Sequence, residues 1–310
     1  MLRFRRGDAG FSLATRLAAA LVLLLLGGVL VSLMIGALPV FRAFGLRFLY
    51  SSSWNPVTEK FGALPAVYGT LVSSLIAMLI AVPVGIGIAV FLTETCPVRL
   101  RWPIGTAVEL LAGIPSIIYG IWGLFVFAPL LQRTLQPALI WSTAKVPLLS
   151  SLFAGPPYGI GILTASLVLA IMVIPFVAAV SRDVVATVPP VMKEAAYSLG
   201  CTTWEVVNKV VLPYTRVGII GGVMLGLGRA LGETMAVTFV IGNAHRIKAS
   251  LLAPGTTISA TIANEFTEAV GRLYTSSLFA LGLVLFLITF IVLAIGRYML
   301  MRLEHRYRSS

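Results

Sequence analysis

Residues 66–93 read AVYGTLVSSLIAMLIAVPVGIGIAVFLT, a run without Asp, Glu, Lys or Arg. A helix of about 20 apolar residues can cross the ~30 Å hydrocarbon core of a bilayer, so this run predicts a membrane-spanning helix. Further long apolar runs with few charges cover residues 17–39, 103–131, 159–181, 217–243 and 276–301. The sequence therefore predicts an all-α integral membrane protein with six transmembrane helices.

The composition of the whole chain agrees with this class. Of its 310 residues, 58% are hydrophobic and 11% are charged, and the mean hydropathy is +0.99. A soluble domain is far less apolar. A net charge of +12 would suggest a nucleic-acid partner for a soluble protein. Here the charges lie mainly between the spans, so we expect membrane lipid and no nucleic acid.

The distribution of Lys and Arg predicts the orientation. If the N-terminus lies inside, the inner segments hold 14 Lys and Arg and the outer ones hold eight, with Arg229 inside the membrane. This asymmetry follows the positive-inside rule, so we expect both termini in the cytoplasm. The first run is longer than the apolar part of a signal peptide and no A-x-A site follows it, which indicates a retained anchor.

The chain divides by these spans into four parts. We expect a cytoplasmic N-terminal tail over 1–16 and a first transmembrane helix with an outer loop over 17–65. The permease core would follow over 66–301, and 302–310 would form a cytoplasmic C-terminal tail. Further outer loops are expected at 132–158 and 244–275.

The inner segment 182–216 is long and polar. Pro190 suits the start of a helix and Gly200 suits a left-handed C-cap, which together predict a short helix over about 191–199.

A second short helix is expected directly afterwards. Thr202 and Glu205 form a capping-box pattern, and the apolar positions that follow continue to Pro213. Two helices joined by a glycine turn also resemble a DNA-binding helix-turn-helix. However, the two lysines of this unit are balanced by two glutamates and it lies between two spans, so a cytoplasmic docking element fits better.

The string EAAYSLG, followed by nine residues and then VVLP, resembles the EAA loop of ABC importer permeases, here within 191–213. In that family the loop forms a coupling helix that sits in a groove of the ATPase subunit. The resemblance implies that Glu194, Ala195, Ala196 and Gly200 contact the ATPase.

Three longer strings resemble the phosphate-specific permeases of the PstC type. They are YGTLVSSLIAMLIAVPVGIGIAVFLTE (68–94), ELLAGIPSIIYGIWGLFVFAPL (109–130) and GIIGGVMLGLGRALGETMAVTFVIGN (218–243). The resemblance implies a type I ABC importer permease fold in a bacterial inner membrane. It also implies a homologous second permease, two ATPase subunits and a periplasmic phosphate-binding protein as partners, with phosphate as the substrate.

The chain is expected to be a channel-forming subunit and not an enzyme. No lysine follows a glycine, so there is no P-loop and ATP hydrolysis must occur on another chain. No cofactor or metal site and no catalytic constellation is expected, since the only histidines, His245 and His305, lie far apart in sequence.

Arg229 and Glu233 are charges inside the fifth span. Each costs about 2.5–3.5 kcal/mol at a helix centre, whereas an i,i+4 ion pair returns only about 0.2–0.5 kcal/mol. They are expected to face a polar translocation pathway, where the planar fork of arginine suits phosphate. The alternative is that they only tie helices together. Small and polar residues at helical spacing would share their stripe: Gly218, Gly222, Gly226 and Ala236.

Glu109 in the third span is the other candidate pathway residue, as a gate contact or a side chain that reaches water. Pro83, Pro115 and Pro175 are candidate kinks. The functional alternatives are an ABC permease for another oxyanion, or an ion-coupled secondary transporter in which Arg229, Glu233 and Glu109 form a relay. The EAA loop argues against the secondary transporter.

Overall fold

The computed structural model describes residues 2–308. Over that part the chain is helical, and its β-structure is a single isolated bridge between Asn55 and Lys60. Six helical segments are long and apolar enough to cross a membrane: Gly10–Phe44, Leu64–Thr95, Ser116–Thr143, Ile162–Ala186, Thr203–Leu231 and Arg272–Arg302. The prediction of an all-α membrane protein with six spans is confirmed.

The helices in chain order are α1 (Leu2–Phe44), α2 (Arg47–Tyr50), α3 (Leu64–Val90), the π-helical turn η1 (Phe91–Thr95), α4 (Val98–Ala112), α5 (Ser116–Trp122), the π-helical turn η2 (Gly123–Phe127), α6 (Ala128–Arg133), α7 (Leu135–Thr143), α8 (Pro147–Leu152), α9 (Ile162–Ala186), α10 (Pro190–Ser198), α11 (Thr203–Val206), the π-helical turn η3 (Val207–Val211), α12 (Leu212–Leu231), α13 (Met235–Val240), α14 (Ile258–Glu265) and α15 (Arg272–Arg308). The segments expected as outer loops therefore contain α7, α8 and α14.

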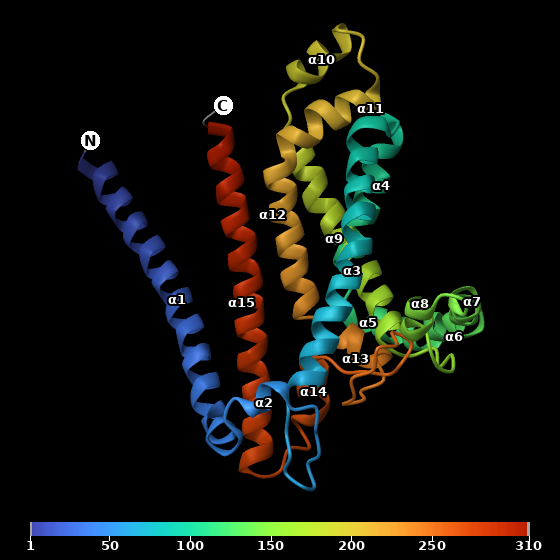
Figure 1. The fold of residues 1–310 in the computed structure, drawn as a ribbon. Coiled ribbons are helices and arrows are strands. Elements are labelled where there is room, and N and C mark those ends of the chain that lie inside the picture. The colour runs from blue at the N-terminus through green and yellow to red at the C-terminus, as the bar shows by residue number, and fades with distance from the viewer. Residues whose placement is uncertain (1, 309–310) are drawn as a thin grey trace.

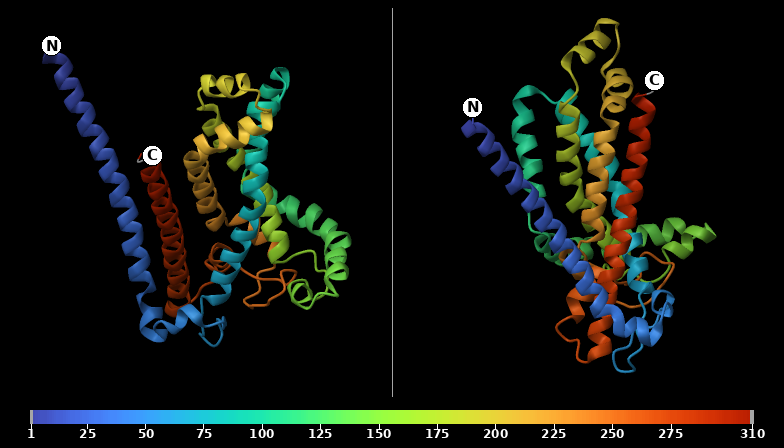
Figure 2. Two further views of the ribbon diagram at one scale, coloured as in Figure 1. Left: turned by 45° about the horizontal axis from the view of Figure 1, so that its top comes forward. Right: turned by 90° about the vertical axis from the view of Figure 1, so that its left-hand side faces the viewer.

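The long helices run between two ends of the molecule. Both chain termini and α10 lie at one end, called the α10 end, and α2 and α14 lie at the other, called the α14 end (Figure 1). Figure 2 shows the same arrangement from two further directions, and in its right-hand view α10 projects beyond the ends of the long helices. Both termini therefore lie on the same side as residues 191–213, which contain the predicted EAA loop and are called the coupling segment below.

The centre of the fold is the pair α3 and α9. Val168, Leu169 and Val173 of α9 are fully buried. A Cβ atom at Gly85 of α3 would lie 2.8 Å from the side chain of Val177, so the glycine permits the close approach of the two helices. Both helices continue past their internal prolines.

α1 and α15 pack together near the α14 end and diverge toward the α10 end (Figure 1). Their contact is a cluster of buried residues that includes Ala37 and Val40 of α1 and Leu278 and Leu281 of α15. Nearer its N-terminus α1 exposes long apolar side chains, as expected for a helix whose surroundings are lipid.

Two predicted spans are broken helices. The run 103–131 is divided between α4 and α5 at residues 113–115, and the run 217–243 is divided between α12 and α13 at residues 232–234. Pro115 lacks a backbone N–H and restricts the residue before it, which favours the first break. Hydropathy alone gives no sign of either break.

The second short helix of the inner segment does not end at Pro213, as the sequence had suggested. α11 continues through η3 directly into α12. The helix widens before the proline, where the N–H of Leu212 donates to the carbonyl of Val207. The π-helical turn accommodates Pro213, which has no backbone N–H to donate and whose ring crowds the preceding turn of the helix.

Candidate translocation gate and coupling segment

The break between α4 and α5 is stabilised by a tyrosine. The hydroxyl of the buried Tyr119 donates to the carbonyl oxygen of Leu111 at 2.9 Å. The N–H of Gly113 still bonds the carbonyls of Glu109 and Leu110. Irregular backbone at membrane depth requires such partners, because lipid supplies none.

The break between α12 and α13 places Arg229 and Glu233 at two helix ends. Arg229 lies in the last turn of α12. Glu233 lies in the break, where its Oε1 accepts from the N–H of Ala236 at 3.3 Å in the first turn of α13. A cation near a helix C-terminus and an anion near an N-terminus are both favourable. The two side chains form no ion pair with each other, and they do not share one continuous helix as the sequence had suggested.

Arg229 lies where three spans meet. Its guanidinium carbon is 5.8 Å from the ring centroid of Phe176 of α9, and it interacts electrostatically with the hydroxyl of Tyr119 of α5. No carboxylate among the described side chains forms an ion pair with it. Its hydrogen-bond donors are therefore available to an anion.

The two short helices that follow the breaks touch. A Cβ atom at Gly120 of α5 would lie 3.0 Å from the carbonyl oxygen of Met235 and 2.8 Å from the ring of Phe239, both on α13. The backbones of α5 and α13 therefore come close at Gly120.

The glycine stripe of α12 is a helix contact. Added Cβ atoms at Gly218, Gly222 and Gly226 would meet valines of α9 at 2.5–3.2 Å. The sequence left open whether this stripe lines the pathway or packs closely, and the structure shows close packing.

Glu109 lies on α4, and its partner is Arg182 of α9. The Arg182 Nη2 donates to the Glu109 Oε1 at 2.6 Å and to the Asp183 Oδ1 at 2.9 Å. The absence of a side chain at Gly105 leaves room for the guanidinium, which would lie 3.1 Å from a Cβ atom there. Glu109 also lines a cavity of about 580 Å³ at the α10 end.

The coupling segment has the local structure predicted for it. α10 covers Pro190–Ser198, and Gly200 has a φ of +85°, a left-handed conformation that favours glycine. Thr202 and Glu205 form both hydrogen bonds of the capping box at the start of α11. The positions of the first helix and of both caps are therefore confirmed.

The residues of the EAA loop point to different sides of α10. Glu194, Ala195 and Gly200 are exposed, whereas Ala196 is buried against valines of α9, α11 and η3. Large apolar side chains are exposed on the same segment, with Leu199 84% and Trp204 71% exposed. An exposed apolar patch of this kind is typical of a protein-protein contact.

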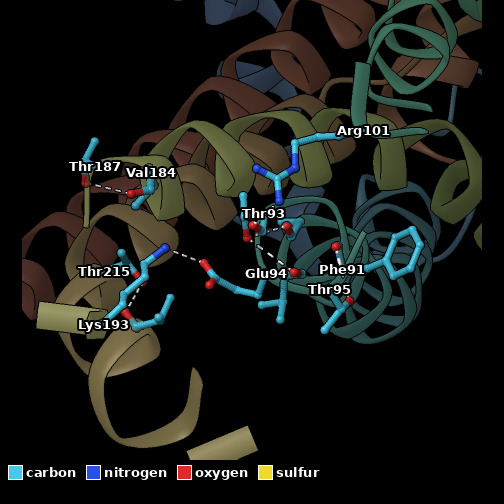
Figure 3. A network of polar contacts seen from close by, with 12 residues as sticks. Phe91, Thr93, Glu94, Thr95, Arg101, Val184, Thr187, Lys193 and Thr215 are labelled. Carbon is cyan, nitrogen blue, oxygen red and sulfur yellow. Dashed lines mark hydrogen bonds and ion pairs between the residues drawn. The ribbon is translucent and has the colours of Figure 1, made fainter. Parts of the chain in front are cut away.

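An ion pair that the sequence did not reveal joins α10 to α3. Lys193 Nζ lies 2.6 Å from Glu94 Oε1, and the Glu94 side chain is only 6% exposed (Figure 3). On the other side of η1, Arg101 of α4 donates to the carbonyl oxygen of Thr93 at 2.9 Å. The partners Glu94 and Lys193 are 99 positions apart, so neither spacing nor local pattern could have paired them.

A second unforeseen cluster lies at the α14 end, formed by Trp54, His245, Glu265 and Tyr274. Glu265 accepts from Trp54 Nε1 at 2.7 Å and from the Tyr274 hydroxyl at 2.9 Å, and its other oxygen lies 2.7 Å from His245 Nε2. Burial alone would raise the pKa of the Glu265 carboxyl, but the hydrogen bonds of His245, Tyr274 and Trp54 hold it below its ordinary value. This cluster ties the outer loop that carries Trp54 to the outer segment 244–275.

Comparison with known proteins defines the class. The profile of the family described as "Binding-protein-dependent transport system inner membrane component" matches residues 81–305, which is most of the chain. The chain belongs to this family, the permeases of binding-protein-dependent ABC transporters. It is therefore a multi-pass membrane subunit of such a transporter and not an enzyme.

Three similar proteins belong to one narrower group within this family, the phosphate transport system permeases. The phosphate transport system permease protein PstC of Mesorhizobium japonicum is 68% identical over 304 residues, covering 98% of this chain and 93% of that protein. The PstC of Pasteurella multocida is 57% identical, covering 96% and 92%. PstC 1 of Mycobacterium tuberculosis is 39% identical, covering 87% and 86%.

Solved structures share the fold. A bacterial alginate ABC transporter in complex with an alginate-bound periplasmic protein gives a TM-score of 0.58 at 17% identity, covering 87% of this chain and 88% of that one. The inward-facing MetNI methionine ABC transporter gives 0.52 at 16% identity, covering 78% and 94%. The type I ABC importer permease fold is thus confirmed.

Proposed function

We propose that this chain is the permease subunit of an ATP-driven phosphate importer, and that it forms the translocation pathway with a homologous second permease. The observation that carries the proposal is the 68% identity, over almost the whole chain, to a phosphate transport system permease protein. The unpaired arginine at a break in the membrane is the chemistry that such a pathway needs.

In the proposed pathway phosphate passes Arg229 at the contact between the two broken helices. The guanidinium donates two parallel hydrogen bonds to the anion, and Glu233 limits how tightly the anion is held. Glu109 lies nearer the α10 end, where its bond to Arg182 opens or closes the inner part of the pathway.

ATP hydrolysis acts through the coupling segment. Two ATPase subunits associate with the permease pair, and one of them receives Glu194, Ala195 and Gly200 with the apolar side chains Leu199 and Trp204. Ala196 does not contact the ATPase. Its small buried side chain allows α10 to pack on α11 and η3. A phosphate-binding protein delivers the substrate at the α14 end.

The proposed orientation places both termini and α10 in the cytoplasm of a bacterium. The Lys and Arg excess on that side supports it, 14 against eight. The α14 end then faces the periplasm.

The test is ATP-driven uptake of labelled phosphate into vesicles that contain the chain with its second permease and ATPase. We expect uptake to need both ATP and the phosphate-binding protein, and excess sulfate not to compete. Transport of sulfate instead would indicate a permease for another oxyanion. Uptake driven by an ion gradient alone would indicate a secondary transporter.

A further inference from the structure

A cavity of about 580 Å³ at the α10 end lies apart from the Arg229 gate. One stripe of α4 forms its wall, and η1, the end of α9 and the start of α10 close it. Three basic side chains line it, Arg101, Arg182 and Lys193, against a single carboxylate, Glu109, among the described residues.

Two of the three cations are already paired. Arg182 is bonded to Glu109 and to Asp183, and Lys193 is bonded to Glu94. These ion pairs hold the walls in place and neutralise Arg182 and Lys193.

Arg101 is the third cation of the lining. It donates one hydrogen bond to the carbonyl oxygen of Thr93, and no carboxylate of the described residues pairs with it. Figure 3 shows Arg101 and Lys193 reaching the turn at 93–94 from two sides. Four of the five N–H donors of a guanidinium remain for a ligand.

Two helices begin at this cavity. Val98 starts α4 and Pro190 starts α10, and both residues line the cavity. Pro190 has no N–H, and the N–H groups of Leu100, Arg101 and Met192 already donate to the carbonyls of Pro97 and Pro189, so the helix starts act mainly through their dipoles, which make these ends positive. The two dipoles add to the attraction that Arg101 exerts on an anion.

Exposed apolar side chains surround the mouth of the cavity. Trp102 is 78% exposed beside it, and Val98 and Leu100 are exposed as well. Exposed Trp next to Arg is typical of the bilayer interface. Basic pockets between helices at this level are typical binding places of phospholipid head groups.

We propose that this cavity binds a phosphate group at the membrane surface, with Arg101 as its main ligand. The group comes from an anionic phospholipid or from free phosphate, and the interfacial position favours the phospholipid. The cavity shares Glu109 and Arg182 with the inner part of the proposed pathway, whereas its main ligand, Arg101, has no part in that pathway, so binding is tested separately from transport.

The test uses the full-length chain, purified with its partner subunits in neutral detergent. Short-chain phosphatidylglycerol, phosphatidylcholine and inorganic phosphate are titrated separately, and binding is read from the thermal unfolding midpoint. Arg101→Gln should weaken phosphatidylglycerol binding about tenfold, because it removes a charge-assisted hydrogen bond. The control is Arg99→Gln, a neighbouring exposed arginine outside the cavity, which should stay within about twofold of wild type.

The outcomes separate the sources. Saturable binding of phosphatidylglycerol, but not of inorganic phosphate, that is sensitive to Arg101→Gln identifies a lipid head group. The same sensitivity with inorganic phosphate identifies free phosphate. The proposal is overturned if neither ligand binds, or if Arg99→Gln weakens binding as much as Arg101→Gln does.

Discussion

Arg229 carries its charge at the C-terminal end of α12. A charged side chain at a helix centre costs about 2.5–3.5 kcal/mol. The dipole of a helix end returns about 0.3–2 kcal/mol, and the contact with Phe176 returns about 0.5–2 kcal/mol. Together these return about 0.8–4 kcal/mol without any carboxylate, which leaves the donors of the guanidinium to the anion of the proposed pathway.

Arg229→Gln should therefore lower phosphate uptake by about 10- to 100-fold, because a charge-assisted hydrogen bond contributes about 1.5–3 kcal/mol. The measurement is ATP-dependent uptake into vesicles, with complex assembly checked by copurification. Arg229→Lys keeps the charge but loses the bidentate fork, so it should retain partial uptake. Wild-type uptake by Arg229→Gln would show that the arginine only ties helices together.

The two alanines of the EAA loop should respond differently to the same substitution. Ala195 is exposed, so Ala195→Glu should leave the unfolding midpoint unchanged and weaken association with the ATPase. Ala196 is buried, so Ala196→Glu should lower stability by about 3 kcal/mol by burying a carboxylate. Midpoints and ATPase copurification measure both effects, and equal midpoints would contradict this assignment of faces.

At the scale of elements, α10 is joined to the membrane helices by more than the chain itself. Lys193 and Glu94 connect it to the end of α3, which is the main partner of α9. In the proposed function, a displacement of α10 by the ATPase therefore acts on the end of α3 through this ion pair, in addition to α9 and α12.

Reversing the charge of either Lys193 or Glu94 alone should uncouple ATP hydrolysis from phosphate uptake. Lys193→Glu and Glu94→Lys each place like charges together in a half-buried site and should cost about 3 kcal/mol. The double reversal should restore much of the ATP-driven uptake, since the attraction returns with opposite polarity. A double variant no better than the poorer single variant would exclude this connection.

The cluster of Trp54, His245, Glu265 and Tyr274 makes the α14 end sensitive to acid. The pKa of Glu265 is lowered in the folded state, so its ionised form contributes stability above the ordinary carboxyl value of about 4.3. That contribution is lost as the pH falls through the lowered value.

Unfolding midpoints across this pH range should show the loss in wild type. Glu265→Gln should be less stable at neutral pH and should depend less on pH, because the titrating group is gone. Glu268→Gln removes a nearby exposed carboxylate and serves as the control. If both variants keep the wild-type pH dependence, Glu265 is not the responsible group.

At the scale of the whole molecule, the six spans, the helix α10 with the glycine that ends it and the capping box that begins α11 could be predicted, because length, apolar character and local capping patterns determine them. The break at Gly232 and Glu233 could not, because the apolar runs on its two sides read as one span. The burial of the Ala196 side chain could not be predicted either, because it depends on how α10 packs on η3. The Lys193–Glu94 ion pair depends on the tertiary fold in the same way. Contacts between distant segments leave no local pattern in a single sequence.

The placement of both termini beside α10 predicts how the molecule lies in the membrane. The N- and C-termini and the coupling segment share one end, and that end carries the excess of Lys and Arg, so it should be cytoplasmic (Figure 1). Val57 lies at the other end and is 92% exposed, which makes it a suitable position for a label.

In a chain whose Cys96 and Cys201 are replaced by serine, a membrane-impermeant maleimide should label Val57→Cys from the periplasm of intact cells. Arg99→Cys, beside η1 at the α10 end, should react only after the inner membrane is permeabilised. The physical reason is that the positive-inside bias resists translocation of the basic segments, while the loop of Val57 carries few such charges. The reverse labelling pattern would place α10 in the periplasm, where no ATPase could reach Leu199 and Trp204, and would contradict the orientation and the coupling role together.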